Sequence, residues 1–299
     1  MQLDIHTVFR AGPVFAIILV AVLVYTWRTR ETYPGFGYSV LLFVAVTIGV
    51  CLLGLRGSAP SYVPVLLGNG LLLGGALLAL QGVKTFFGRG RLRSRYWIAL
   101  ALVELGLAFF LYVSPDLNVR VLIVSFFLGI TCLLITRELF LSAPAQVRTS
   151  ARLTGTIVGA YGCTMILRGL VTILWDPLPM FFAPNAFQTA MVIASLGAGL
   201  LSTFGFIIMN SERLEYELKV TGRLLEEREG YLRTILDSVQ AGVMVVDRET
   251  HRIVHMNALA GDLLGVQRQN VIDQVCHGSV CPAQKGVCPV SDLGLTVQN

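Results

Sequence analysis

Three cysteines and one histidine lie close together near the carboxyl end of the sequence, and residues of these types bind metal ions or take part in redox chemistry. They are Cys276, His277, Cys281 and Cys288, in the stretch VCHGSVCPAQKGVCPVSD. Three thiolates and an imidazole would complete a tetrahedral zinc site or hold an iron–sulfur cluster. Their spacing matches neither the CxxC pairs of zinc sites nor the common ferredoxin runs. The pattern therefore leaves two interpretations open, a metal site at these four residues or reduced cysteines with a local packing role.

A second group of candidates consists of polar side chains inside long apolar runs, where ionisable groups are costly and for that reason often functional. The group comprises Glu104, Arg168 and Asn69. Glu104 is expected near the middle of its run, either as a proton or ion site or as a protonated packing residue hydrogen-bonded to Asn69. Arg168 is expected nearer the end of its run, as a functional cation or as an anchor that reaches the membrane surface. Because their depths differ by roughly 10 Å, no direct ion pair is expected.

The elements that position these residues follow first from composition. The 299 residues are 55% hydrophobic and only 14% charged, and the mean hydropathy is +0.70. Such a chain is an integral membrane protein, with the lipid bilayer as its first partner. The net charge of +5 comes from basic residues in the connections between apolar runs. Because basic residues at those places set membrane topology, nucleic acid is not an expected partner.

Seven apolar runs each approach the roughly 20 residues that a helix needs to cross a bilayer. We expect spans at Val8–Trp27, Phe36–Leu55, Val63–Phe87, Trp97–Val113, Val119–Leu139, Leu153–Trp175 and Ala186–Met209. Ten Lys and Arg residues fall in the first, third and fifth connections, against three on the alternate side. This asymmetry predicts an amino terminus outside and a carboxyl terminus in the cytoplasm.

A charged amphipathic helix is expected directly after the last span, from Ser211 to Gln240. Alternating steps of four and three connect the positions of one seam, namely Leu214, Leu218, Thr221, Leu225, Arg228, Leu232 and Ile235. This spacing predicts a parallel coiled coil between two copies of the chain. A solvated amphipathic connector is the alternative, because barely three heptads are available. The expected domains are a seven-helix membrane bundle (1–210), this helix (211–236) and a small carboxyl-terminal domain (237–299).

The carboxyl-terminal domain begins with two strand-like runs, GVMVVD and RIVHMN, around a short polar turn. A helix is expected over Ala258–Leu264, with Asn257 as its cap and Gly265 as its stop. His251 falls in the turn and His255 in the second run, and neither is expected to bind a ligand.

The string LDSVQAGVMVVDRETHRIVHMNALAGDLLG resembles the opening of a PAS sensory domain. Only two of the five strands of a PAS fold can be read, so we expect a partial α+β PAS domain. The layout of seven spans followed by a charged helix resembles the membrane region of bacterial sensor histidine kinases and diguanylate cyclases. This resemblance implies a homodimer in the bacterial inner membrane that acts on a downstream signalling module or response regulator. The CysHis, CysPro, CysPro pattern is similar to that of PAS domains in anaerobe signalling proteins, which implies metal or redox use.

The mainly α fold expected from these elements favours a membrane signal-transduction sensor that relays a signal through a dimeric helix to the PAS domain. No phosphoacceptor box, ATP-binding glycine box or cyclase signature occurs in the sequence, so we expect a receptor and no catalytic module. The first alternative is a membrane transporter or channel with a regulatory tail, in which Glu104 would be the proton or ion site. The second is a membrane enzyme that uses the cysteine cluster as a redox centre.

Overall fold

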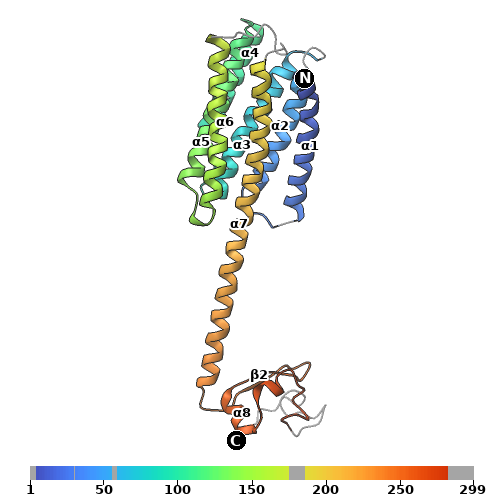
Figure 1. Cartoon of the computed structure of the whole chain (residues 1–299), viewed down its shortest axis with the longest axis vertical. Coiled ribbons are helices and arrows are strands. Elements are labelled where there is room, and N and C mark those ends of the chain that lie inside the picture. The colour runs from blue at the N-terminus through green and yellow to red at the C-terminus, as the bar shows by residue number, and fades with distance from the viewer. Residues whose placement is uncertain (1–4, 30, 56–58, 175–185, 282–299) are drawn as a thin grey trace. The chain divides into compact units, whose positions relative to one another are not determined.

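The computed structural model describes residues 5–29, 31–55, 59–174 and 186–281, and it is mainly helical (Figure 1). The chain divides into two compact units, Met1–Tyr216 and Glu217–Asn299. The first unit is a helical bundle, and the second combines a small antiparallel sheet with short helices.

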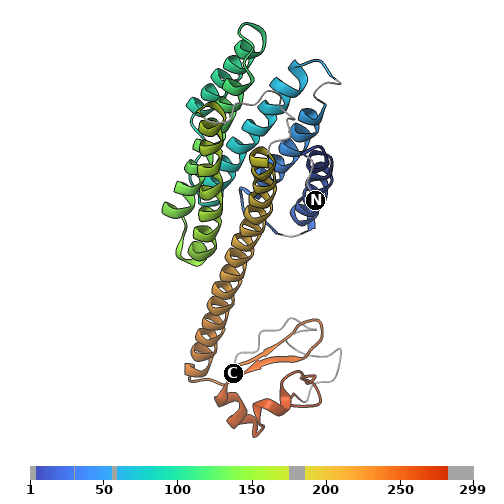
Figure 2. The same cartoon turned by 45° about the horizontal axis from the view of Figure 1, so that its top comes forward.

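Long apolar helices lie side by side in the first unit (Figure 1, Figure 2). In chain order they are α1 (Ile5–Thr29), α2 (Phe36–Gly54), the π-helical segment η1 (Val63–Gly68), α3 (Asn69–Phe86), α4 (Ser94–Tyr112), α5 (Leu117–Leu141), the short 3-10 helix η2 (Ala145–Val147), α6 (Arg148–Leu174) and α7 (Ala186–Ser238). Within the described residues, six helical segments are long and apolar enough to cross a membrane, if η1 is counted with α3 and η2 with α6. These segments confirm the expected membrane-type helices after residue 35. The described apolar part of α1, Ala16–Thr29, is shorter, so a seventh span stays a prediction.

Helices α5 and α6 form the most closely packed pair of the bundle. Gly129 and Gly162 face each other, and a Cβ atom on either glycine would lie 2.9–3.0 Å from the carbonyl oxygen of the other. The Thr136 hydroxyl on α5 donates to the Gly155 carbonyl oxygen on α6 at 3.1 Å. Small residues at such places allow helix backbones to approach closely inside a membrane. The two helices therefore act as one rigid element.

The largest apolar core lies at the end of the bundle where α3 ends, which we call the basic end because Lys84, Arg89, Arg91, Arg93 and Arg95 follow one another there. The fully buried Phe86 of α3 is its centre. The Phe86 ring lies 5.3 Å from the ring of Phe206 on α7 and 5.9 Å from that of Tyr33 in the α1–α2 connection. This aromatic cluster joins α7 to the other helices at the basic end.

Helix α7 continues without a break from the last apolar run through the charged segment to Ser238. The sequence predicts two elements here, a span that ends at Met209 and a separate helix that begins at Ser211. The residues between them contain neither proline nor glycine, so no physical signal ends the helix. Gly222 and Gly230 each cost about 1 kcal/mol of helix propensity and do not interrupt it. The seam residues Leu218 and Leu225 are 74% and 60% exposed, and their pairing in a coiled coil stays a prediction.

The second unit contains the predicted hairpin and the predicted helix. Strand β1 (Met244–Val246) pairs antiparallel with β2 (Ile253–Met256), with a register shift between Val245 and Val246. Helix α8 covers Ala258–Leu264, as expected, and a further short helix, α9, covers Arg268–Val271. A small core formed by Ile253, Met256, Ala260 and Val271 holds these elements together.

Candidate functional site

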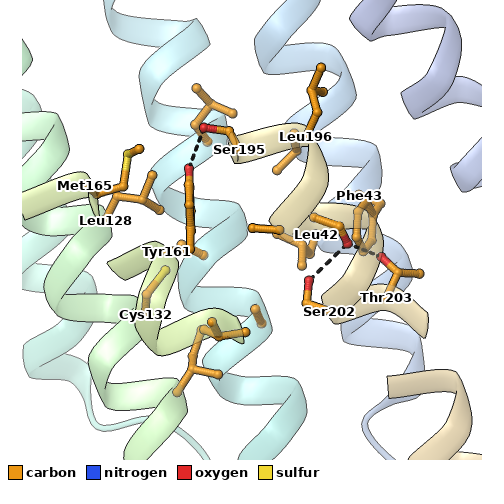
Figure 3. Close-up of a pocket in the computed structure, with 18 of the residues that line it drawn as sticks. Leu42, Phe43, Leu128, Cys132, Tyr161, Met165, Ser195, Leu196, Ser202 and Thr203 are labelled. Carbon is orange, nitrogen blue, oxygen red and sulfur yellow. Dashed lines mark hydrogen bonds between the residues drawn. The ribbon is translucent and has the colours of Figure 1, made fainter. Parts of the chain in front are cut away.

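A cavity of about 370 Å³ lies inside the helical bundle, between α7 and the helices α2, α3, α5 and α6. Its volume falls in the range of small-molecule sites, roughly 300–1,000 Å³. Most of the side chains around it are apolar, such as Leu42, Phe43, Leu128 and Met165 (Figure 3). Because this cavity lies between them, much of α7 does not pack directly against the rest of the bundle.

Four hydroxyl groups on the wall of this cavity, those of Tyr161, Ser195, Ser202 and Thr203, form hydrogen bonds within the protein. The Tyr161 hydroxyl on α6 donates to Ser195 Oγ on α7 at 3.1 Å, and Ser195 Oγ donates in turn to the Met191 carbonyl oxygen at 2.7 Å (Figure 3). Ser202 and Thr203 both donate to the carbonyl oxygen of Gly199, at 3.0 Å and 2.7 Å. Because each of these protons has an acceptor in the protein, the wall does not demand a polar occupant.

Two arginines line the cavity near the end opposite the basic end, which we call the far end. Arg120 lies in the first turn of α5, where its Nε donates to the Asp116 carbonyl oxygen at 3.1 Å. Arg168 lies near the end of α6 and is half-buried. The sequence predicts a functional cation or a surface anchor at Arg168, and the structure places this residue on the cavity wall. Arg120 was missed because its position beside a helix start suggested a topology determinant alone.

Glu104 lies on α4 and faces α3. Its Oε1 is buried and has no hydrogen-bond partner among the described residues. A Cβ atom on Gly70 of α3 would lie 3.1 Å from this oxygen, so the glycine makes room for the carboxyl group. The expected hydrogen bond between this oxygen and Asn69 is not formed; Asn69 Nδ2 donates instead to the Val65 carbonyl oxygen at 2.7 Å. Glu104 does not line the cavity that holds Arg168.

Helix α7 is held at the basic end by polar contacts with three other segments, which we call the clamp. Arg213 donates to the Phe86 carbonyl oxygen, and its guanidinium carbon lies 4.1 Å from the centroid of the Tyr33 ring. Asn210 Oδ1 accepts from the Tyr33 backbone N–H at 3.0 Å. Glu212 Oε1 accepts from Ser150 Oγ at 2.5 Å. The clamp therefore connects α7 with the α1–α2 connection, the end of α3 and the start of α6.

Sequence reasoning missed the clamp. Neither Arg213 nor Tyr33 was singled out, although a polar segment that immediately follows an apolar span is a signal for such contacts. An arginine over an aromatic ring is worth roughly 0.5–2 kcal/mol, more when the pair is shielded from water.

Closest contact between α6 and α7 occurs one to two turns before the clamp. A Cβ atom on Gly205 of α7 would lie 2.0 Å from Oγ1 of Thr154 on α6. Farther along the same helix, Cβ atoms on Gly197 and Gly199 would have no neighbour within 4 Å. Helix α7 thus approaches α6 closely at Gly205, near the basic end, and is loosely packed around the cavity.

In the second unit, Asn257 joins the end of α7 to the PAS-like hairpin. Its side chain is completely buried. Oδ1 accepts from the backbone N–H groups of Val243 and Ala260 at 2.8 Å and 2.9 Å. Nδ2 donates to the carbonyl oxygens of Leu236 and Ala241, both at 2.9 Å. The predicted helix cap is therefore also the connection between α7, β1 and α8.

The described part of the cysteine cluster forms one compact turn. The Cys276 carbonyl oxygen accepts from the backbone N–H groups of Ser279, Val280 and Cys281 at 3.1–3.3 Å. Cys276 also packs against the small core of the second unit. No three His, Cys, Asp or Glu side chains among the described residues are grouped as metal ligands. Cys288 lies outside the described residues, so metal binding by Cys276, His277, Cys281 and Cys288 stays a prediction.

The two hairpin histidines have surroundings that their sequence positions did not reveal. The His251 ring lies 5.4 Å from the His277 ring, and the His251 backbone has a positive φ of 55°. His255 Nδ1 lies 3.2 Å from Nη2 of Arg268, while its Nε2 is buried and has no hydrogen-bond partner in the described part of the chain. Burial, together with the nearby charge of Arg268, lowers the pKa of His255. His255 is therefore held as a neutral imidazole near pH 7.

Comparison with known proteins identifies one part of the chain. The family model of the PAS domain matches residues 230–288, which include the last turns of α7, the hairpin, α8 and α9. No curated protein matches the chain, and no solved structure does. The chain thus combines a PAS domain with several helices long and apolar enough to cross a membrane. A PAS domain suggests a role in signalling, and helices of this length and composition suggest a membrane protein.

Proposed function

We propose that this protein is an integral membrane signal-transduction sensor in which α7 relays a change in the helical bundle to the PAS domain. One observation carries the proposal. Helix α7 runs without interruption from Ala186 in the bundle to Ser238, and the PAS match begins within it, at residue 230. Because a continuous helix transmits rotation and translation along its axis, a shift at the cavity or the clamp would reach Asn257.

The finer parts of the proposal rest on the charge distribution and on the leucine seam. The basic end would face the cytoplasm of a bacterium, with the chain in its inner membrane and the amino terminus outside. Two copies would pair in parallel through the seam of α7 and act on a downstream signalling module or a response regulator. The exposure of Leu218 and Leu225 supports such pairing, since water-exposed leucines on one helix face favour association.

Cysteine crosslinking in membranes tests both the pairing and the relay. Cysteines at Leu218 or Leu225 are expected to form disulfides between copies, because both positions lie on the seam. Cysteines at Lys219 or Glu226, one residue further along the helix, are the matched controls and should crosslink less. The variant Arg213→Ala, which opens the clamp, should change the crosslinking rate at Leu225 if α7 is a relay. Equal crosslinking at seam and control positions would reject the dimer, and a rate indifferent to Arg213→Ala would reject the relay.

The buried Oε1 of Glu104 supports a second candidate function, a transporter or channel with a regulatory tail. A carboxyl group without a hydrogen-bond partner inside an apolar helix is a common feature of proton pathways. Proton or ion flux into vesicles that contain the purified chain, abolished by Glu104→Gln, would favour this function. Vesicles that show no such flux, with crosslinking that responds to Arg213→Ala, would favour the sensor.

Metal binding at Cys276, His277, Cys281 and Cys288 belongs to the same proposal, as a means by which the PAS domain would sense metal or redox state. Thiolates clustered in a reducing compartment favour a bound cation, either zinc or an iron–sulfur cluster. Metal content and visible absorbance of the anaerobically purified chain, compared with those of Cys281→Ser, distinguish a metal site from the packing role.

A further inference from the structure

We propose that the cavity beside α7 binds an amphiphile with an anionic head and a single hydrocarbon chain. The head would lie at Arg120 and Arg168, and the chain would extend along the apolar wall toward the basic end. This inference rests on the proposed function, because it names the class of ligand that would move α7.

The charge of the lining residues favours an anion. Arg120 and Arg168 line the cavity, and no Asp or Glu is among the described residues that do so. The nearby carboxylate of Asp116 caps α5, where its Oδ1 accepts from the backbone N–H groups of Asn118 and Val119 at 2.8 Å and 3.2 Å. Its negative charge also interacts with Arg120 and offsets part of the positive charge, but the two arginines and this one carboxylate together remain positive. Arg120 uses its Nε for the Asp116 carbonyl oxygen, and the fork geometry of guanidinium suits carboxylate and phosphate oxygens.

The two arginines lie at nearly the same depth on the neighbouring helices α5 and α6, and both line the same cavity. Gly169, next to Arg168, packs against Leu122 and Phe126 of α5, where a Cβ atom would lie 3.2 Å from either side chain. Arg168 is therefore within about one helical turn, roughly 5 Å, of Arg120 along the bundle.

The rest of the cavity suits a hydrocarbon chain. Lining residues of α5 extend from Leu117 to Leu139, and the part between Arg120 and Leu139 corresponds to roughly 28 Å at 1.5 Å per residue. A volume of about 370 Å³ spread over this length makes the cavity narrow, so an unbranched chain fits better than a fused ring system. The hydroxyls of Tyr161, Ser195 and Thr203 have acceptors within the protein, so they do not require a polar group on the hydrocarbon chain of the ligand.

An occupant of this cavity would press directly on α7. Lining residues on that helix extend from Val192 to Met209, while the clamp holds the same helix at Asn210 and Arg213. A filled cavity would displace the loosely packed part of α7 around Gly199, whereas the clamp would act as the fulcrum.

Binding to the purified full chain in phosphatidylcholine nanodiscs tests the inference. The probes are radiolabelled oleate, oleyl alcohol with the same tail and no charge, and lysophosphatidylglycerol with a different anionic head. We expect saturable binding of oleate or of lysophosphatidylglycerol, at least 10-fold tighter than that of oleyl alcohol. Preference for oleate would indicate a free fatty acid as the source, and preference for lysophosphatidylglycerol would indicate a phospholipid. Equal binding of oleate and oleyl alcohol would overturn the anionic head.

Variants locate the site. Arg120→Gln and Arg168→Gln should weaken oleate binding at least 10-fold, whereas Arg152→Gln, an exposed arginine on the same helix as Arg168, should leave it unchanged. Gly199→Leu places a side chain on the cavity wall and should block binding, and Gly197→Leu, which does not line the cavity, is its control. Thermal unfolding of each variant shows that the fold is retained. Oleate binding that survives Gly199→Leu and both arginine variants would reject this cavity as the site.

Two separate results distinguish this inference from the proposed relay. If oleate binds as expected and crosslinking at Leu225 does not respond, the ligand site stands and the relay is wrong. If crosslinking responds to Arg213→Ala and no anionic amphiphile binds, the relay stands and the ligand site is wrong.

Discussion

Asn257 shows how one side chain connects three elements of the PAS unit. Its amide group forms four hydrogen bonds, all with backbone groups, namely those of Val243, Ala260, Leu236 and Ala241. The side chain is fully buried, so water cannot replace a lost partner. A change at this residue leaves several buried backbone groups without partners, which is costly.

Replacement of Asn257 by alanine is expected to destabilise the second unit by about 3 kcal/mol, because it removes a helix cap and orphans buried donors and acceptors. Asn257→Asp keeps the two accepted bonds and should cost less. The measurement is hydrogen exchange of the β1 and β2 amides in the full chain. Asn270→Ala, an exposed asparagine in α9, is the matched control. Unchanged exchange in Asn257→Ala would contradict the role of Asn257 as a connection.

His255 makes the stability of the same unit depend on pH. Its pKa is lowered in the fold by burial and by the charge of Arg268. The unfolded chain therefore binds a proton more readily than the folded one, so stability is present above the ordinary pKa of 6.5 and is lost as the pH falls below it. Hydrogen exchange of β2, corrected for intrinsic rates, should accelerate between about pH 7 and about pH 5 in the parent chain. The variant His255→Gln should lose this pH dependence, and the control His251→Gln should keep it. If the pH dependence persists in His255→Gln, another group is responsible for it.

Helix α7 behaves as two differently packed segments of one element. Near the basic end it meets α6 at Gly205 and Thr154, and the clamp fixes the next turns through Asn210, Glu212 and Arg213. Around Gly199 it faces the cavity. A helix that is fixed at one end and loosely packed at the other responds to a ligand by tilting, which a uniformly packed helix would resist.

A methyl group at Gly205 is expected to separate α6 and α7, because its Cβ would lie 2.0 Å from Thr154 Oγ1. Gly205→Ala should lower the free energy of unfolding of the purified chain, measured by thermal unfolding, by about 1–3 kcal/mol, the usual cost of overpacking. Gly197→Ala, where nothing lies within 4 Å, should have little effect. The double variant Gly205→Ala with Thr154→Ala removes the obstructing hydroxyl and should recover part of the loss. Equal stability of Gly205→Ala and Gly197→Ala would show that the two helices do not meet there.

Across the whole molecule, charge is distributed unequally between the two ends of the bundle. The α3–α4 connection carries several basic residues, of which Lys84 and Arg89 lie 3.6 Å and 3.9 Å from the carboxylate of Glu138. One carboxylate shared by two cations leaves an excess of positive charge at the basic end. Positive charge in short connections favours the cytoplasmic side of a membrane.

Reporter fusions test the resulting topology. Alkaline phosphatase, which is active only outside the cytoplasm, is expected to be inactive when fused after Arg91 and active when fused after Ser114, in the next connection. A cytoplasmic fluorescent reporter should show the opposite pattern. Phosphatase activity after Arg91 would reverse the proposed orientation.

Local patterns were sufficient to predict much of the fold. Apolar runs near 20 residues predict six of the helices because a backbone in lipid must satisfy its hydrogen bonds internally. The α8 helix was predicted to the residue, since Asn257 and Gly265 are a cap and a stop whose effect depends on neighbours within four positions. The hairpin was predicted from two strand-like runs on either side of a short polar turn.

Contacts between residues far apart in the chain could be identified only from the tertiary structure. The sequence around Arg213 does not show that the partner of its guanidinium group is Tyr33. The sequence also does not show that Arg120 and Arg168 line one cavity. Such pairings depend on which helices become neighbours. Apolar helix faces of similar hydropathy could pack against one another in many ways, and the shapes of their side chains select one arrangement. The cavity and the clamp arise from that packing, whereas the helices that form them arise from local sequence.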